Sequence, residues 1–98
     1  MEKLKLLGIE KSNGRLRYSF GKRKSFIPLF SNFLLHCGFT DIEILEHIDI
    51  FEERLYMKSF DNSKHNIDLF ILEDKIILLI RTSEKDFVQK EIENMVSE

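Results

Sequence analysis

The run of apolar residues at Ile76–Ile80 constrains the fold of this 98-residue chain more than any other segment. A strand alternates its side chains between two faces, so this run puts apolar groups on both faces of a sheet. Such a strand is typical of a sheet centre that is covered on both sides. The run is far shorter than the about 20 residues that a membrane-spanning helix needs. We therefore expect a sheet with the strand Lys75–Arg81 in its middle.

A β-hairpin is expected at the start of the chain, where Asn13-Gly14 separates the strands Lys3–Lys11 and Arg15–Phe20. Both turn residues tolerate the positive φ angles of a type I′ turn, which makes Asn-Gly the strongest short hairpin signal. The apolar residues of the first strand change phase along its length. This change predicts a β-bulge near Leu7-Gly8.

Two helices are expected from capping residues and apolar periodicity. The first is capped by Ser25 and runs to Cys37, with Gly38 as its left-handed C-cap. Its apolar residues lie nearly all round its circumference, which is typical of a helix covered on more than one side. The second helix begins at Glu84, with Ser83 as its N-cap.

Four strands are expected between the helices. Their predicted bounds are Asp41–Ile50, Arg54–Phe60, Asn66–Leu72 and Lys75–Arg81. The fold class is therefore α+β: an N-terminal β-hairpin, a helix, a four-stranded antiparallel meander and a C-terminal helix (ββ-α-ββββ-α), with the helices packed on an antiparallel sheet in one domain, 1–98. Without one hairpin strand, this element order resembles the β-α-β₄-α order of the TATA-box-binding-protein-like and helix-grip folds. A resemblance in element order implies no functional residue.

Charge is sorted along the chain. Residues 1–25 hold eight Lys and Arg against two acids, whereas residues 26–98 hold seven against fifteen, so the net charge of −2 conceals two opposite balances. A basic segment on an acidic body favours a charged partner or pairing with its own acidic neighbours. The candidate binding residues of this basic segment are Arg15, Arg17, Lys22, Arg23 and Lys24.

A surplus of apolar surface also indicates a partner. If both helices pack on one face of the sheet, the other face of the central strand needs a second subunit or another protein to cover it. We therefore expect a small cytosolic, non-catalytic protein-binding or regulatory module. It would recognise a protein partner through complementary charge and would form a homodimer, the commonest way to bury such a surface.

Nucleic-acid binding by the basic hairpin is the alternative hypothesis. Arg15 and Arg17, with the connector Lys22–Lys24, would contact phosphates, and an aromatic side chain would stack on a base. The expected hairpin register, however, puts Tyr18 on the opposite side from the arginines and sets Arg17 across from Glu10. Nucleic-acid-binding domains are usually basic overall, whereas this chain is net negative.

A small enzyme is the third hypothesis, and it requires a pocket that holds His47 or His65 beside a carboxylate. His36-Cys37 is not a nucleophile–base pair, because adjacent helix residues project about 100° apart. Cys37 is expected to pack in the core, and as the sole cysteine it forms no intrachain disulfide. No metal-binding spacing is present. We expect no cofactor, no membrane association, no signal peptide and a reducing cytosol as the location.

Overall fold

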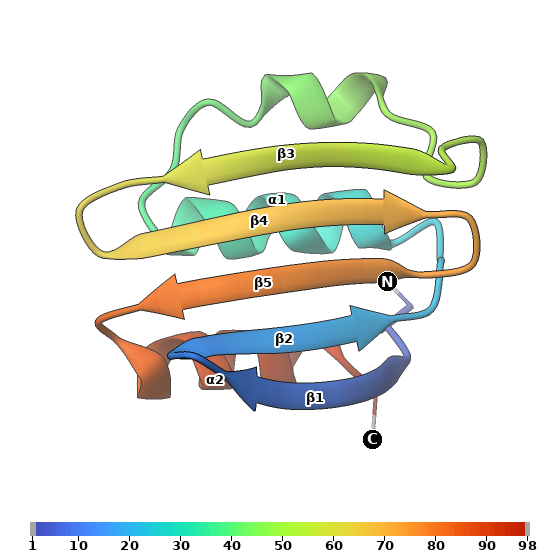
Figure 1. Cartoon of the computed structure of the whole chain (residues 1–98). Coiled ribbons are helices and arrows are strands. Elements are labelled where there is room, and N and C mark those ends of the chain that lie inside the picture. Colours follow the sequence, from blue (N-terminus) through green and yellow to red (C-terminus); the bar gives the residue numbers. More distant parts are fainter. Residues whose placement is uncertain (1, 98) are drawn as a thin grey trace.

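The computed structural model describes residues 2–97 as an α+β fold (Figure 1). Five strands form one antiparallel sheet in the order β1-β2-β5-β4-β3, and both helices lie on the same face of it. The elements are β1 (Leu6–Ser12), β2 (Arg15–Phe20), α1 (Phe26–His36), the 3₁₀ helix η1 (Glu43–His47), β3 (Leu55–Asp61), β4 (His65–Leu72), β5 (Ile76–Thr82) and α2 (Lys85–Met95). The α+β class predicted from the sequence is confirmed.

The central position of the apolar strand is also confirmed. β5 pairs with β2 on one side and with β4 on the other, so it joins the N-terminal hairpin to the remaining strands. Its residues Ile76, Leu78 and Ile80 point toward the helices and are fully buried. Ile77 and Leu79 point to the other face of the sheet, which no helix covers.

The hairpin forms as predicted. Asn13 and Gly14 have φ angles of 51° and 75°, the left-handed values that a type I′ turn requires. The register shifts between Leu6 and Gly8, which confirms the predicted bulge. The bulge puts Leu6, rather than Leu7, across from Phe20. Leu7 is left half exposed.

The first strand begins at Leu6, later than the predicted Lys3. Leu4, two residues before this strand, pairs instead with the chain just beyond α2. Its N–H donates to the Met95 carbonyl at 2.8 Å, and its own carbonyl accepts from the Ser97 N–H at 2.9 Å. The two ends of the chain are therefore tied together beside the hairpin.

The predicted strand Asp41–Ile50 is wrong, because this segment contains η1 instead. The apolar residues that pack inward are Ile42, Leu45 and Ile48, and Leu45 is fully buried. Their spacing of three residues is the period of a 3₁₀ helix, and it overrides the alternation on which the strand was based. The meander therefore has three strands, and the resemblance to a β-α-β₄-α order is lost.

The predicted helix caps are wrong in detail. Ser25 occupies the N-cap position of α1, but its hydroxyl makes no capping hydrogen bond. α2 begins at Lys85, and the N–H of Glu84 donates to the Thr82 hydroxyl at 2.9 Å, so Ser83 does not cap this helix. Gly38 has a φ of 93°, as predicted for a residue that ends a helix in the left-handed conformation.

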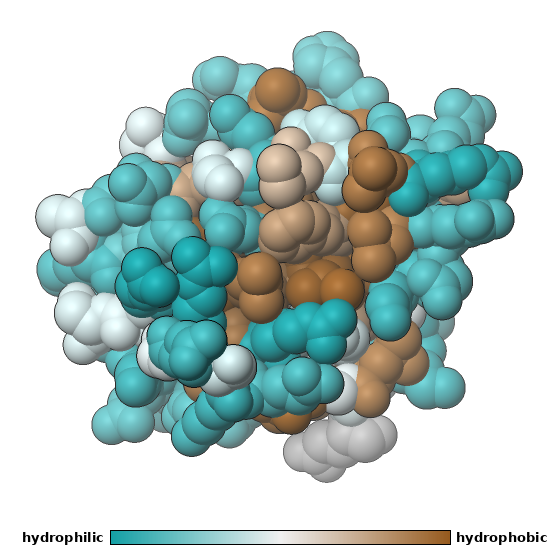
Figure 2. Space-filling view, in the orientation of Figure 1, coloured by the Kyte–Doolittle hydropathy of each residue, from teal (hydrophilic) through white to brown (hydrophobic). Residues whose placement is uncertain are grey.

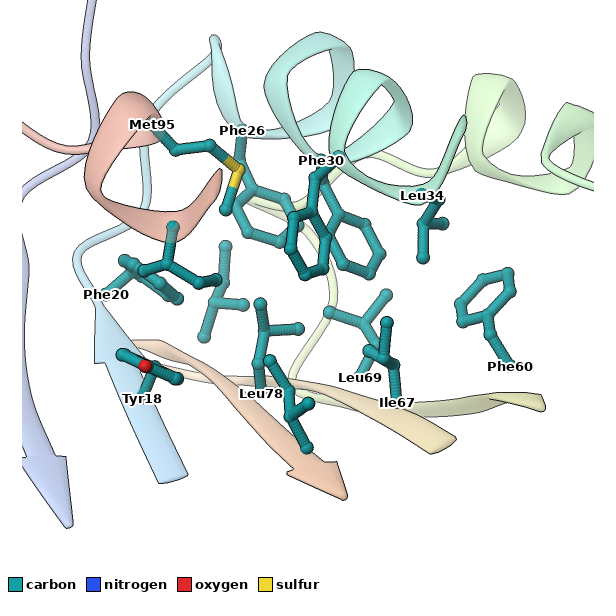
Figure 3. Packing of buried hydrophobic residues seen from close by; sticks show 14 of the residues in the cluster. Tyr18, Phe20, Phe26, Phe30, Leu34, Phe60, Ile67, Leu69, Leu78 and Met95 are labelled. Atoms are coloured by element: carbon teal, nitrogen blue, oxygen red, sulfur yellow. The ribbon is translucent and has the colours of Figure 1, made fainter. Parts of the chain in front are cut away.

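The core fills the space between the sheet and the helices (Figure 3). Phe26 and Phe30 project from α1 toward the sheet, Met95 projects from α2, and Leu69 and Leu78 meet them from β4 and β5. The rings of Phe26 and Phe30 lie 5.2 Å apart, centroid to centroid. Because the whole core lies on this side, the helices leave the opposite face of the sheet free.

Candidate interaction surface

The face of the sheet that points away from both helices is the open face (Figure 1). Alternation along each strand places on it the residues that do not point into the core. Toward one end of the strands these residues are apolar. This apolar strip comprises Leu55, Met57, Phe70, Leu72, Ile77 and Leu79. Figure 2 shows it as a brown band, bordered by hydrophilic side chains.

The apolar strip is buried at its centre and strongly exposed at the edge of the sheet. Ile77 lies between Ser19 and Phe70 and is only 7% exposed. On the edge strand β3, Leu55 is 80% exposed and Met57 is 65% exposed. Contiguous exposed apolar surface on a small domain marks a site of interaction. The strip is therefore a candidate surface for contact with another macromolecule.

The opposite end of the open face carries an arginine cluster, which consists of Arg15, Arg17 and Arg81. The register that pairs Leu16 with Ile80 sets Arg15 across from Arg81 on adjacent strands. All three arginines line a hollow of about 550 Å³. Like charges opposite one another in a sheet are unfavourable, so this cluster requires negative groups nearby.

Two of the three arginines form ion pairs with acidic residues. Nη1 of Arg17 lies 3.3 Å from Oε1 of Glu10, and Nη1 of Arg15 lies 3.9 Å from Oδ2 of Asp68. Asp68 also accepts a hydrogen bond of 2.7 Å from the hydroxyl of Ser59. Within residues 2–97, no carboxylate lies within 4.0 Å of Arg81. The cluster thus keeps one guanidinium without an acidic partner in the described chain.

The five basic residues singled out in the sequence do not form one surface. Arg15 and Arg17 lie on the open face, whereas Lys22, Arg23 and Lys24 follow the far end of β2. There Lys22 and Arg23 contact their own chain. Nζ of Lys22 donates to the Glu53 carbonyl at 2.8 Å, and Nη1 of Arg23 lies 3.8 Å from Oε2 of Glu2. Much of the positive charge of the basic segment is therefore compensated by contacts within the chain.

Sequence reasoning missed the two features that shape the open face. Arg81 joins Arg15 only through the pairing of β5 with β2, which brings together residues far apart in the chain. Leu55 and Met57 alternate with core residues of β3, so their face is apparent only once Phe60 is known to point inward. A pattern of apolar residues on both phases of a strand was the available signal.

His65 lies where β4, β5 and α2 meet, in the wall of a hollow of about 630 Å³. Nδ1 of its ring is 2.7 Å from the Thr82 hydroxyl, and Nε2 is 3.6 Å from Oε1 of Glu84. Burial lowers the pKa of His65, and Lys64 adds to this effect while Glu84 opposes it. The enzyme hypothesis required a histidine beside a carboxylate, and this is the position that comes closest.

The remaining candidate residues are separate from one another. His47 is exposed in η1, and it does not lie on a strand face as expected. His36 contacts the carboxylate of Glu91. Cys37 is buried as predicted, and burial, with Glu91 and Glu84, raises the pKa of its thiol to about 12. The thiol is therefore protonated at neutral pH, which makes it a poor nucleophile.

Two absences complete the description of residues 2–97. Over this range, no three His, Cys, Asp or Glu side chains gather in a way that suits a metal ion. No helix in the same range combines the length and the apolar character that crossing a membrane requires. Compared with known proteins, the chain matches no family model, no curated protein and no solved structure.

Proposed function

We propose that this protein is a small cytosolic, non-catalytic binding module that recognises another protein chain with its open face. The observation that carries this proposal is the uncovered apolar strip, in which Leu55 and Met57 expose most of their surface. Transferring such side chains out of water is favourable by about 25 cal/mol for each Å² of apolar surface, before the entropic cost of association is subtracted. The proposal includes a regulatory role, which the module would exert by occupying its partner.

The charged end of the open face supports a protein as the partner. Arg17 and Asp68 lie on opposite sides of Leu79, so positive and negative groups alternate within one row across the sheet. Mixed charges beside an apolar patch fix the orientation of a partner and exclude wrong ones. A surface of one sign would instead favour a polyanion.

A photoreactive amino acid placed at position 57 tests the proposal in the source cells. Position 35 is the matched control, because Leu35 is an apolar residue of 49% exposure on α1. Irradiation should give discrete protein adducts from position 57, and Leu55→Glu should abolish them. Adducts that form equally from positions 57 and 35, or from neither, would overturn the proposal.

Nucleic-acid binding remains the second candidate, and the hollow between Arg15, Arg17 and Arg81 is the observation that favours it. Tyr18 is buried on the helix side of the sheet, so no stacking platform accompanies these arginines. Mobility shifts of DNA and RNA at several salt concentrations test this candidate. Binding that weakens steeply with salt and is lost in the double variant Arg15→Glu/Arg17→Glu would favour it over protein binding.

The geometry around His65 supports a role without catalysis. Its side chain is only 2% exposed. Nδ1 lies 2.7 Å from the Thr82 hydroxyl, and Nε2 lies 3.6 Å from Oε1 of Glu84, so both nitrogens point into the chain. A general base needs a free nitrogen within reach of a substrate. The contacts of His65 instead join the start of β4 to the end of β5 and the start of α2.

A further inference from the structure

One row of residues on the open face changes steadily in size across the sheet. The paired positions, from β1 to β3, are Gly8, Ser19, Ile77, Phe70 and Met57. The β1 and β2 side of this row is low, because glycine has no side chain and serine a short one. No heavy atom lies within 4 Å of a Cβ built at Gly8, so the space above it is open. The β4 and β3 side carries large side chains.

The next row shows the same asymmetry in charge. Arg17 lies on the β2 side of Leu79, and Asp68 lies on the β4 side. The side-chain exposure of Asp68 is 17%, so its carboxylate is partly withdrawn from water yet still reachable. The two sides of each row are therefore complementary. In the first row, small side chains on one side of β5 correspond to large ones on the other, and in the second row a positive charge corresponds to a negative one.

We propose that the open face binds a second copy of this chain, related by a two-fold axis that lies in the interface parallel to β5. This inference rests on the proposed function, for which it names the partner. Rotation about this axis brings the apolar ends of the two sheets together. It also exchanges the β1 and β2 side of the sheet with the β4 and β3 side. β2 of one copy then lies over β4 of the other, and β1 lies over β3.

This arrangement places matching groups together. Phe70 and Met57 of each copy enter the low region above Ser19 and Gly8 of the other, and the two apolar strips meet along β5 at Ile77 and Leu79. Arg17 of each copy faces Asp68 of the other. A contact formed in this way occurs twice, as in every two-fold interface.

The other two-fold axis in the same plane runs across the strands, and it fits poorly. This axis leaves each strand over its own counterpart in the other copy. With the axis at the row of Leu79, Arg17 would face Arg17 and Asp68 would face Asp68, so like charges would meet twice. The charges of the open face therefore select the axis along β5.

The flat area of the open face is slightly below what a stable pair needs. Five strands about 4.8 Å apart and about seven residues long make a rectangle of about 24 by 23 Å. Two such faces bury about 1,100 Å² as flat surfaces, near the lower bound of about 1,200 Å² for specific interfaces, and the relief of the side chains adds to this area. At the polar end Arg81 faces Arg81 of the second copy, a contact between like charges that the hollow around them leaves open to water.

Charge reversal across the axis gives a specific test. Arg17→Glu and Asp68→Arg are made in separate full-length chains, and each is measured alone and in an equimolar mixture by sedimentation equilibrium. Each variant alone should dimerise at least about tenfold more weakly than the wild type, since like charges then face one another twice. The mixture should recover a heterodimer, because both contacts are again between opposite charges.

A second variant tests the same axis without changing charge. Gly8→Leu has open space in the single chain but fills the region that Met57 of the other copy requires. It should keep the circular dichroism spectrum and melting temperature of the wild type and lose dimerisation at least about tenfold. If either charge variant fails to fold, Gly8→Leu alone tests the axis along β5.

The outcomes separate this inference from the function on which it rests. A wild-type chain that stays monomeric up to about 1 mM overturns the second copy as partner. Adducts from position 57 with a different protein would then leave the proposed function standing. A dimer that is insensitive to Gly8→Leu, or a charge-variant mixture that fails to recover, overturns the two-fold axis along β5.

Discussion

The thiol of Cys37 is the clearest case in which a single residue's surroundings set its chemistry. Its pKa of about 12 reflects burial first and the nearby acids Glu91 and Glu84 second. We expect the native thiol to react with iodoacetamide far more slowly than a free cysteine at pH 8, and the unfolded chain to react at the ordinary rate. Mass spectrometry of timed samples measures both rates. Equal rates in the two states would contradict the buried position.

A second single residue, His65, makes the free energy of unfolding depend on pH. Burial lowers its pKa below the ordinary value of 6.5, so the unfolded chain takes up a proton more readily than the folded one. The free energy of unfolding should therefore fall as the pH drops from 6.5 toward the lower pKa of the folded state. Urea denaturation at pH 7.5 and 5.5 measures the change. His65→Gln should show a smaller difference between the two pH values, and an unchanged difference would contradict this account.

At the scale of the element, η1 rests on one buried side chain. Leu45 is fully buried, whereas the adjacent Ile44 is 46% exposed. Leu45→Ala should lower the free energy of unfolding by about 2–5 kcal/mol, because it leaves a cavity beneath the 3₁₀ helix. Ile44→Ala, the matched control, should change it by less than about 0.5 kcal/mol. Urea denaturation of both variants checks this, and similar losses would instead indicate a strand with both phases packed.

The same elements show what sequence reasoning could reach. Asn13-Gly14 predicted the hairpin because its turn geometry is encoded locally, and Ile76–Ile80 predicted the central strand because so many apolar side chains fit nowhere else. The segment around Leu45 was misread because Ile42 and Ile48 lie six residues apart, a spacing that fits both a period of two and a period of three. The arginine cluster escaped prediction because it depends on pairing between β2 and β5.

At the scale of the whole molecule, two helices on one side of the sheet determine which surface is available. The basic segment and the acidic remainder pair partly with each other, as Arg17 does with Glu10 and Arg15 with Asp68. Sorted charge along the sequence therefore contributes orientation rather than a free basic surface. The apolar strip supplies the binding energy in this account, and the neighbouring charges supply the geometry.

The most direct measurement of this claim compares two single variants by sedimentation velocity over a range of concentrations. Met57→Lys puts a charge into the apolar strip, and Leu35→Lys puts the same charge on the outward side of α1, at comparably exposed positions. We predict that Met57→Lys sediments as a monomer at concentrations where the wild type and Leu35→Lys both sediment as dimers. Dimerisation that survives Met57→Lys but is lost in Leu35→Lys would show that the helical side, and not the open face, is where this molecule binds.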